Sequence, residues 1–231
     1  MPNRFKQIKD HFEQEAAIFD KMFFRIVPYY EEAMEAIKSA LPFKKTDKVR
    51  IIDMGCGTGN LTKKIALAFP KAEIICLDMA ENMLKLAKAK LSKHPNVSFW
   101  QGDIREFSFQ GKYDAIVSSL VLHHVEKKGK LQFYKKLHKA LHSGGVFYNF
   151  DILTSANKHI NDLLYDNWKD YMGNSGLPPA KYNEMIHRHK LEDRPVTFEE
   201  EMNLLQKAGF KYVDVIWRRI QLGAVYGAVK K

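Results

Sequence analysis

The chain has 231 residues, 45% of them hydrophobic, and a formal net charge of +10. This length suits one domain with a sizeable apolar core, and no run of 18 apolar residues that could cross a membrane occurs in it. Residues 1–10 are polar and charged, so we expect no secretory signal and a cytoplasmic protein. The only two cysteines, Cys56 and Cys76, are too few for a disulfide framework.

The N-terminal part of the chain is rich in aromatic residues. Apolar residues recur at mostly helical spacing over 4–20, which predicts an amphipathic helix, and Pro28 lies near the expected start of a second helix over 29–40. Such a segment could cover a ligand pocket, and its Arg25 and Tyr30 could hold a ligand carboxylate. The alternative is that these side chains only pack the helices on the rest of the protein.

The first predicted strand runs into a glycine loop. Residues 49–52 are short, β-branched and apolar, as in a strand buried in a parallel sheet, and Asp53-Met54-Gly55-Cys56-Gly57-Thr58-Gly59 follows. Three glycines at alternate positions permit positive φ angles and let a ligand lie against the main chain. A helix over 60–69 would point its N-terminal amides at that ligand. A second strand over 72–77 ends at Asp78, where a carboxylate can accept hydrogen bonds from both hydroxyls of a ribose.

The elements that follow extend the same sheet. Residue spacing predicts a helix over 80–91, a third strand over 96–100 and a fourth strand over 113–119. A helix over 131–141, stopped by Ser143-Gly144-Gly145, leads to a fifth strand over 146–152. Ligands of open α/β sheets lie beyond the carboxyl ends of the strands, so the residues at these ends are candidates for ligand contact.

Two adjacent histidines, His123 and His124, come shortly after the fourth predicted strand. Imidazole is the side chain that best accepts a proton near neutral pH, so either could act on a bound substrate. Adjacent side chains point in different directions, so we expect at most one to face the substrate; both could instead be structural or exposed. We expect no metal site, because no third ligand with suitable spacing lies nearby in the sequence.

Most of the excess positive charge lies between residues 51 and 150. Six lysines alternate with apolar residues on the helix after the fourth strand, a pattern usually found on a solvated helix face. Phosphate binding is the alternative, and it is not favoured, because no interleaved arginine or exposed aromatic platform would read bases. The six are Lys127, Lys128, Lys130, Lys135, Lys136 and Lys139.

The glycine loop departs from the dinucleotide fingerprint, because Asn60 stands where that motif needs its third glycine. Its pattern D-x-G-x-G-x-G resembles motif I of the class I S-adenosylmethionine-dependent methyltransferases. Asp78-Met79, Gly102-Asp103-Ile104, the fourth strand and Gly144-Gly145 follow in the order of that family. The resemblance implies an α/β fold with a Rossmann-like, mostly parallel seven-stranded sheet, a C-terminal antiparallel hairpin, and S-adenosyl-L-methionine as cofactor.

The resemblance also assigns roles to residues. The glycine loop would pack against the amino-acid part of the cofactor, and Met79 would lie on the adenine ring. Asp103 would accept a hydrogen bond from the adenine amino group, and the Ile104 amide would reach a ring nitrogen. The predicted cofactor-binding residues are Asp53, Gly55, Cys56, Gly57, Gly59, Asp78, Met79, Asp103, Ile104, Ser119, Leu120, Arg25 and Tyr30, and the predicted catalytic residues are His123 and His124.

The remaining residues complete a single expected domain, 1–231. Residues 1–45 would form the N-terminal helices or lid, 49–152 the cofactor-binding core, 153–195 a helical cap that walls an acceptor pocket, and 196–231 the last helix and hairpin.

The last part of the chain carries two local signals. Thr197 and Glu200 form a capping box that opens a helix ended by Gly209. Alternating residues over 210–217 and 220–229 then predict two antiparallel strands.

Together these features predict methyl transfer from S-adenosylmethionine to an N, O, S or C atom of a small-molecule acceptor. The protein would hold that atom in line, about 3 Å from the methyl group, and remove its proton if it carries one. A nucleic-acid methyltransferase is one alternative, although Ser118-Ser119-Leu120-Val121 stands where amino-methylating enzymes of that class carry Asn/Asp-Pro-Pro-aromatic. An enzyme that modifies the cofactor itself would share every motif. We expect no membrane partner, and a monomer or homodimer.

Overall fold

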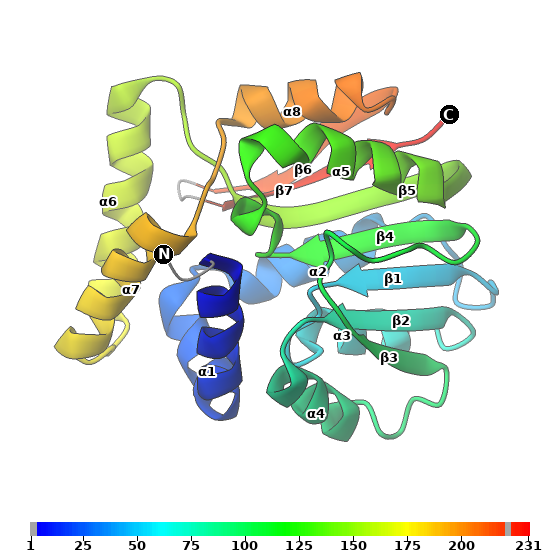
Figure 1. Ribbon diagram of the computed structural model, residues 1–231, viewed down its shortest axis with the longest axis horizontal. Helices are drawn as coiled ribbons and strands as arrows, with labels where there is room; N and C mark the ends of the chain where they lie inside the picture. The colour runs from blue at the N-terminus through cyan, green and yellow to red at the C-terminus, as the bar shows by residue number, and fades with distance from the viewer. Residues whose placement is uncertain (1–3, 220–222) are drawn as a thin grey trace.

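The computed structural model describes residues 4–219 and 223–231. They form a seven-stranded sheet with helices on both faces (Figure 1). No helix among these residues is long and apolar enough to span a bilayer. The strands are β1 (Arg50–Met54), β2 (Glu73–Asp78), β3 (Val97–Gln101), β4 (Tyr113–Ser119), β5 (Leu141–Ile152), β6 (Tyr212–Arg218) and β7 (Gly223–Val229). The helices are α1 (Arg4–Ile26), α2 (Tyr30–Ala40), α3 (Asn60–Ala68), α4 (Glu81–Lys90), α5 (Lys127–Ala140), α6 (Lys158–Asn174), α7 (Pro179–Glu192), α8 (Phe198–Lys207) and the 3₁₀ turn η1 (Leu122–His124).

The strand order is β3-β2-β1-β4-β5-β7-β6. The first five strands pair in parallel, and β7 runs antiparallel to both β5 and β6. This confirms the predicted sheet and its C-terminal hairpin, although residues 220–222 of the last predicted strand lie outside the described part of the chain. The carboxyl ends of β1, β2 and β4 meet at one edge, on the side where α1, α6 and α7 lie (Figure 1).

Helices bury both faces of the sheet. Met34 and Ile37 of α2 and Ile65 of α3 pack on one face, and Leu137 of α5 and Leu205 of α8 pack on the other. Because helices cover both faces of the sheet, β1 and β4 are buried along almost their whole length. Strand β6 lies at the edge of the sheet and alternates between half-buried and exposed residues. The core thus holds the ends of the central strands in fixed positions.

Two predicted boundaries differ from the structure by five residues or more. Helix α1 continues to Ile26 instead of ending near residue 20, and β5 begins at Leu141. Gly144-Gly145, predicted to stop a helix, therefore lies inside the strand. Gly144 has a φ of 78°, and its N–H donates to the Lys230 carbonyl at 2.8 Å. A left-handed glycine ends many helices, but here it serves an irregular stretch of strand.

One of the six lysines predicted on a solvated face is buried. Lys130 is 1% exposed, and its Nζ lies 3.1 and 3.2 Å from the carboxylate oxygens of Glu201 on α8. The other five lysines are exposed, as predicted. Lys130 is turned inwards because it lies one helical turn from Phe133 and Tyr134, which face the core.

Candidate active site

A first cavity lies at the carboxyl ends of β1, β2 and β4, beneath α1. Its wall contains most of the predicted cofactor-binding residues and, from α1, a row of apolar side chains. The predicted residues in the lining are Tyr30, Asp53, Gly55, Cys56, Gly57, Asp78, Met79, Asp103, Ile104, Ser119, Leu120 and His124. The α1 residues are Phe5, Ile8, Phe12, Phe19 and Phe23.

Two predicted cofactor residues do not line this cavity. Gly59 lies behind the loop as the N-cap of α3, with a φ of 82°, and a Cβ on it would meet Leu91 and Ala87 of the neighbouring helix. Arg25 is exposed, and its Nη1 donates to the Gly176 carbonyl at 3.1 Å. The predicted contact between Arg25 and the cofactor does not fit this position, because α1 turns Phe23 toward the cavity and Arg25 away from it.

The glycines of the loop have different tasks. Gly55 and Gly57 have φ angles of 72° and 52°. A Cβ on Gly55 would lie 2.3 Å from Cγ2 of Val121, so the fold itself requires glycine there. A Cβ on Gly57 would meet no heavy atom of the described residues within 4 Å. Gly57 therefore keeps room for a ligand.

Three carboxylates face this cavity. Asp78 accepts hydrogen bonds from the N–H groups of Gly57 (2.8 Å) and Ala80 (2.9 Å), so it ties the loop to the end of β2. Burial raises the pKa of Asp78, and it raises the pKa of Asp53, which accepts from the Thr62 hydroxyl at 2.6 Å, to about 7. Asp103 is paired with the guanidinium of Arg105, whose Nε lies 3.0 Å from both of its oxygens.

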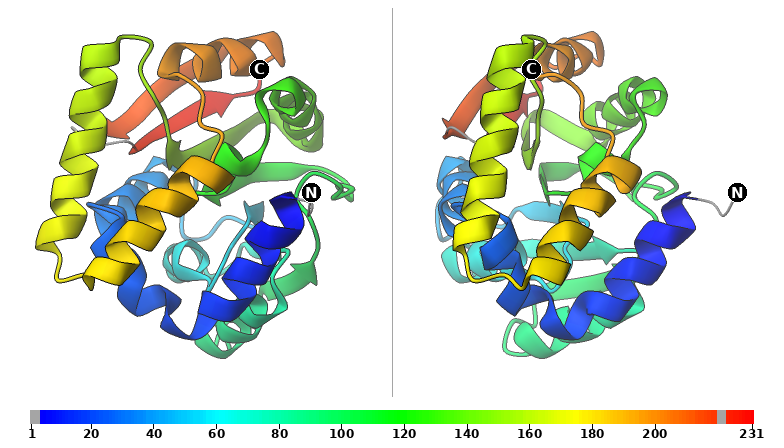
Figure 2. Two further views of the ribbon diagram at one scale, coloured as in Figure 1. Left: turned by 60° about the vertical axis from the view of Figure 1, so that its left-hand side comes forward. Right: turned by 90° about the vertical axis from the view of Figure 1, so that its left-hand side faces the viewer.

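A second cavity adjoins the first. The two share Phe12, Phe19, Phe23, Leu120 and His124 as lining residues. Figure 2 shows α6 and α7 beside α1 at the ends of the strands, and these three helices supply much of the second wall. Apolar side chains dominate it, and its charged or ionisable residues are Glu15, His123, His124, Arg188, His189, Glu192 and Asp193.

The junction of the two cavities carries backbone strain. Leu120 has a φ of 57°, which is unusual for a residue other than glycine, and its N–H donates to the Phe150 carbonyl at 2.7 Å. Such conformations persist where the surroundings fix them, and they are often found at functional sites.

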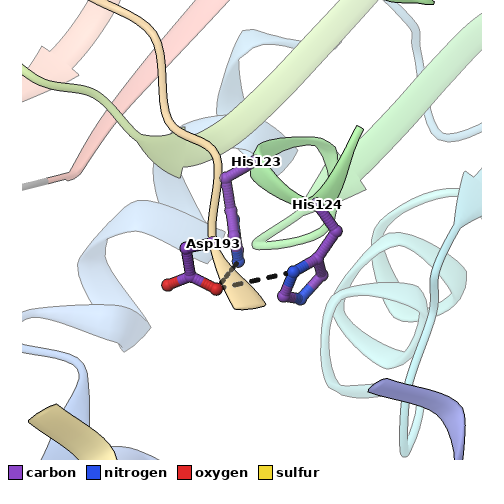
Figure 3. Close-up of side chains that lie close together, drawn as sticks. All are labelled: His123, His124 and Asp193. Carbon is purple, nitrogen blue, oxygen red and sulfur yellow. Dashed lines mark ion pairs between the residues drawn. The ribbon is translucent and has the colours of Figure 1, made fainter. Parts of the chain in front are cut away.

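Both histidines turn toward Asp193 (Figure 3). His123 Nε2 and His124 Nδ1 lie 3.4 and 3.5 Å from the same oxygen of Asp193. His123 Nδ1 lies 2.5 Å from Asp151, at the end of β5. The expectation that adjacent side chains diverge is wrong here, because the η1 turn leaves the two rings 4.1 Å apart between centroids and both line the second cavity.

The pKa values of the two imidazoles are shifted in opposite directions. Burial acts to lower the pKa of His123, but the carboxylates of Asp193 and Asp151 outweigh it and the pKa is raised. Burial, followed by the neighbouring His123, lowers the pKa of His124 to about 4. Near neutral pH His124 is therefore neutral. Neither of its ring nitrogens makes a well-formed hydrogen bond among the described residues.

The sequence interpretation missed Asp151, Arg188 and Asp193. Asp151 ends a parallel strand, which is a signal that could have been used. Arg188 and Asp193 lie in the cap, where no motif marks them. The Arg188 guanidinium donates to Glu15 at 2.8 Å, whereas its buried Nε has no hydrogen-bond partner among the described residues. Burial lowers its pKa to about 10.

Comparisons with known proteins agree with this geometry. Residues 51–145 match a family model described as a methyltransferase domain. A carboxy-S-adenosyl-L-methionine synthase of Nautilia profundicola is 30% identical over 210 residues, which cover 89% of this chain and 88% of the relative. The chain belongs to the class I S-adenosylmethionine-dependent methyltransferase family. The synthase of the same name from Campylobacter hominis is also 30% identical, over 92% of both chains.

Solved structures show the same fold for this family member. The pyocyanin biosynthetic protein PhzM superposes with a TM-score of 0.69 at 20% identity, over 96% of this chain and 62% of PhzM. A DhpI–SAM–HEP complex superposes with a TM-score of 0.68 at 17% identity, over 99% of this chain and 98% of DhpI.

The enzyme uses S-adenosylmethionine, and the first cavity fits this cofactor. Gly57 leaves open space against the main chain, and buried acids offer acceptors for hydroxyl and ammonium groups. The residues that would hold the cofactor are those at the strand ends, above all Asp53, Asp78 and the glycine loop. When bound, the cofactor supplies an electrophilic methyl group on its sulfonium.

Replacing Asp78 with alanine is expected to weaken cofactor binding. Asp78 is predicted to accept hydrogen bonds from the ribose hydroxyls of the cofactor. One such charge-assisted hydrogen bond contributes about 1.5–3 kcal/mol, which corresponds to a loss of roughly tenfold to a hundredfold in affinity. Titration calorimetry with S-adenosylhomocysteine measures this loss. Asp78→Asn should retain more affinity, because an amide oxygen can still accept from a backbone N–H. An unchanged affinity in Asp78→Ala would contradict the assignment.

Cofactor affinity is expected to rise with pH between about 6 and 8. The free protein holds a proton on Asp53 up to about pH 7, and a cation bound beside it favours the carboxylate, so below pH 7 binding must release that proton. For a pKa near 7 the affinity rises by about tenfold over this range and then levels off. Calorimetry at several pH values measures it. In Asp53→Asn the rise should disappear, and a slope equal to that of the unaltered enzyme would exclude Asp53 as its source.

Proposed function

We propose that this enzyme transfers the methyl group of S-adenosylmethionine to an N, O, S or C atom of a small, largely apolar acceptor held in the second cavity. The observation that supports the proposal is that the two cavities adjoin and share Phe12, Leu120 and His124 in their linings. An acceptor held in the second cavity would therefore lie next to a methyl group presented in the first.

The lining of the second cavity supports an organic acceptor with an aromatic or apolar body. Phe12, Phe23, Trp168 and Met185 offer apolar and aromatic surface, and three histidines lie around Asp193. Cavities of this composition bind the body of a ligand by apolar contact and orient it with a few polar groups. The acceptor would therefore carry one polar or ionisable group next to its reacting atom.

His123 and His124 are the residues we propose for contact with that group. His124 lines both cavities, so it lies where an acceptor atom would approach the cofactor. His123 lines the second cavity only, and Asp151 orients its ring. A side chain within hydrogen-bond reach of the acceptor can take its proton and hold it in line at the same time.

Modification of nucleic acid is less well supported. The exposed lysines of α5 lie on the helix that packs with α8 on one face of the sheet, whereas the cavities open at the strand ends. Charges that guide a nucleic acid would be expected around the mouth of the cavity.

Carboxylation of the cofactor is a second candidate. The two relatives named above are carboxy-S-adenosyl-L-methionine synthases, and Arg188 is a specific observation that favours the same reaction here. Its guanidinium lines the second cavity, and its Nε has no hydrogen-bond partner among the described residues, although it lies 3.7 Å from the Glu192 carboxylate. A guanidinium binds a carboxylate in two-point geometry, so Arg188 could hold a carboxylic-acid donor in the second cavity. In such a reaction the donor's bond to its carboxyl carbon breaks, that carbon bonds to the cofactor's methyl carbon, and the proton lost from the methyl group passes to the rest of the donor.

Mass spectrometry of the reaction products separates these functions. The enzyme is incubated with S-adenosylmethionine and a panel of phenols, aromatic amines, thiols and carboxylic acids. Release of S-adenosylhomocysteine together with a methylated acceptor supports methyl transfer. A carboxylated sulfonium product without S-adenosylhomocysteine supports the second candidate. If neither product forms with any compound of the panel, both functions are refuted for these compounds.

Arg188→Lys is the matched variant for the second candidate. Lysine keeps the positive charge beside Glu15 but cannot bind a carboxylate in two-point geometry. Formation of a carboxylated cofactor should fall by more than tenfold, while methylation of an acceptor without a carboxylate should change less. Equal losses in both reactions would exclude a specific role for Arg188 in carboxylate binding.

A further inference from the structure

We propose that His123, His124 and Asp193 form a binding site for a divalent zinc-type cation in the wall of the second cavity. Nε2 of His123 and Nδ1 of His124 lie 3.4 and 3.5 Å from the same oxygen of Asp193. The three ligand atoms all lie within 4.8 Å of one another (Figure 3).

The two separations from the Asp193 oxygen match tetrahedral coordination. Zn²⁺ binds imidazole nitrogen and carboxylate oxygen at about 2.0–2.1 Å, so neighbouring ligands of a tetrahedral ion lie about 3.3–3.4 Å apart. Octahedral coordination at similar bond lengths would bring them to about 3.0 Å. Three protein ligands leave one position of a tetrahedral ion open, and the cluster borders the second cavity. With the ion bound, this open position would take the place of the coordinating imidazole nitrogens in contacting the acceptor's polar group.

The residues around the cluster support the ligands in the way metal sites require. His123 Nδ1 lies 2.5 Å from Asp151, an arrangement that leaves the Nε2 lone pair free for a metal. His189 Nδ1 lies 2.7 Å from the other oxygen of Asp193 and orients this carboxylate. These partners are the outer contacts that commonly hold histidine and carboxylate ligands in place.

The buried imidazole of His124 is a second observation that points to a bound ion. Its side chain is buried, with 9% of the residue exposed, and neither ring nitrogen makes a well-formed hydrogen bond among the described residues. A buried polar side chain without such a partner costs free energy unless something binds it. A cation between His124 and Asp193 would satisfy the imidazole and balance the buried carboxylate.

A second group of possible ligands, His11, Glu15 and Glu184, is less suited to a cation. Glu184 is exposed, and Glu15 already pairs with Lys181 and Arg188. The positively charged side chains of Lys181 and Arg188 next to Glu15 would repel a metal ion. Glu184 lines neither cavity, so Glu184→Gln provides a control that leaves the proposed site intact.

Metal binding by the full chain, without a histidine tag and without S-adenosylmethionine, tests the proposal independently of the transferase activity. After treatment with a chelator, the protein should bind one equivalent of Zn²⁺ in calorimetry. Co²⁺ in its place should give the intense visible absorption of a four-coordinate ion. Absence of stoichiometric binding, or the weak spectrum of a six-coordinate ion, would overturn the proposal.

Variants locate the ion. His124→Ala should weaken Zn²⁺ binding by more than a hundredfold, and Asp151→Asn by roughly tenfold to a hundredfold, because it removes the partner that orients His123. Glu184→Gln should bind as the unaltered protein does. Circular dichroism shows whether each variant is folded. If a variant is unfolded, the Co²⁺ spectrum of the unaltered protein still tests whether the protein has a four-coordinate metal site. Loss of binding in Glu184→Gln with retention in His124→Ala would place the ion at the other cluster and refute the site.

Discussion

Gly57→Val is expected to abolish cofactor binding while the protein stays folded. A Cβ at this position meets no heavy atom of the described residues within 4 Å, so the valine side chain would enter the first cavity without a clash in the free protein. It would fill the space that a ligand needs against the main chain. We expect the dissociation constant for S-adenosylhomocysteine to rise by at least a hundredfold, measured by titration calorimetry. The left-handed backbone conformation, with a φ of 52°, should cost about 1–2 kcal/mol of stability.

Gly144→Val is the matched control for this substitution. Gly144 has a φ of 78°, a Cβ on it also meets open space among the described residues, and it lines neither cavity. It should therefore show a similar loss of stability without any loss of affinity. If Gly57→Val binds the cofactor as tightly as the unaltered enzyme, the ligand does not lie against this part of the loop.

Glu201→Ala is expected to destabilise the protein by about 3–5 kcal/mol, because it leaves the buried ammonium of Lys130 without its counter-ion. Lys130 and Glu201 are 1% and 0% exposed, and their charged groups lie 3.1 Å apart. The Glu201 carboxylate also accepts hydrogen bonds from the hydroxyls of Tyr134 and Tyr226. These donors would lose their acceptor as well, and unfolding in urea, followed by circular dichroism, measures the sum.

The double variant Lys130→Met/Glu201→Leu tests the cause. It removes both charges, so it should be more stable than Glu201→Ala, although the tyrosine hydroxyls still lack Glu201. Asp162→Ala, which breaks the exposed pair between Lys158 and Asp162, should change the unfolding midpoint too little to measure. A double variant as unstable as Glu201→Ala would show that the unpaired charge is not the reason for the loss.

The same buried residues connect the far side of the sheet to the active site. Tyr226 accepts a hydrogen bond at 2.7 Å from Asn149, whose side-chain amide also donates to Asp151 at 3.2 Å. Asp151 in turn holds His123. Glu201→Ala is therefore expected to change the orientation of His123 in addition to lowering the stability of the fold.

The local sequence was sufficient to predict the cofactor half of the molecule. A buried strand, glycines at alternate positions, a helix and a second strand ending at Asp78 are consecutive in the chain, and each follows from the conformational preference of its own residues. The structure brings Gly57 and Asp78 together through a 2.8 Å hydrogen bond. The capping box of Thr197 and Glu200 is likewise confirmed, since all its atoms lie within one helical turn.

Only the tertiary structure could decide which side chains surround the acceptor cavity. Asp193 meets His123 and His124 because the cap folds back across the strand ends, and no spacing rule relates residues so far apart in the chain. The burial of Lys130 depended on Glu201 of another helix, and the exposure of Arg25 depended on which face α1 turns inwards. Short-range pattern sets where elements form, whereas the identity of a site's neighbours is set by how those elements pack.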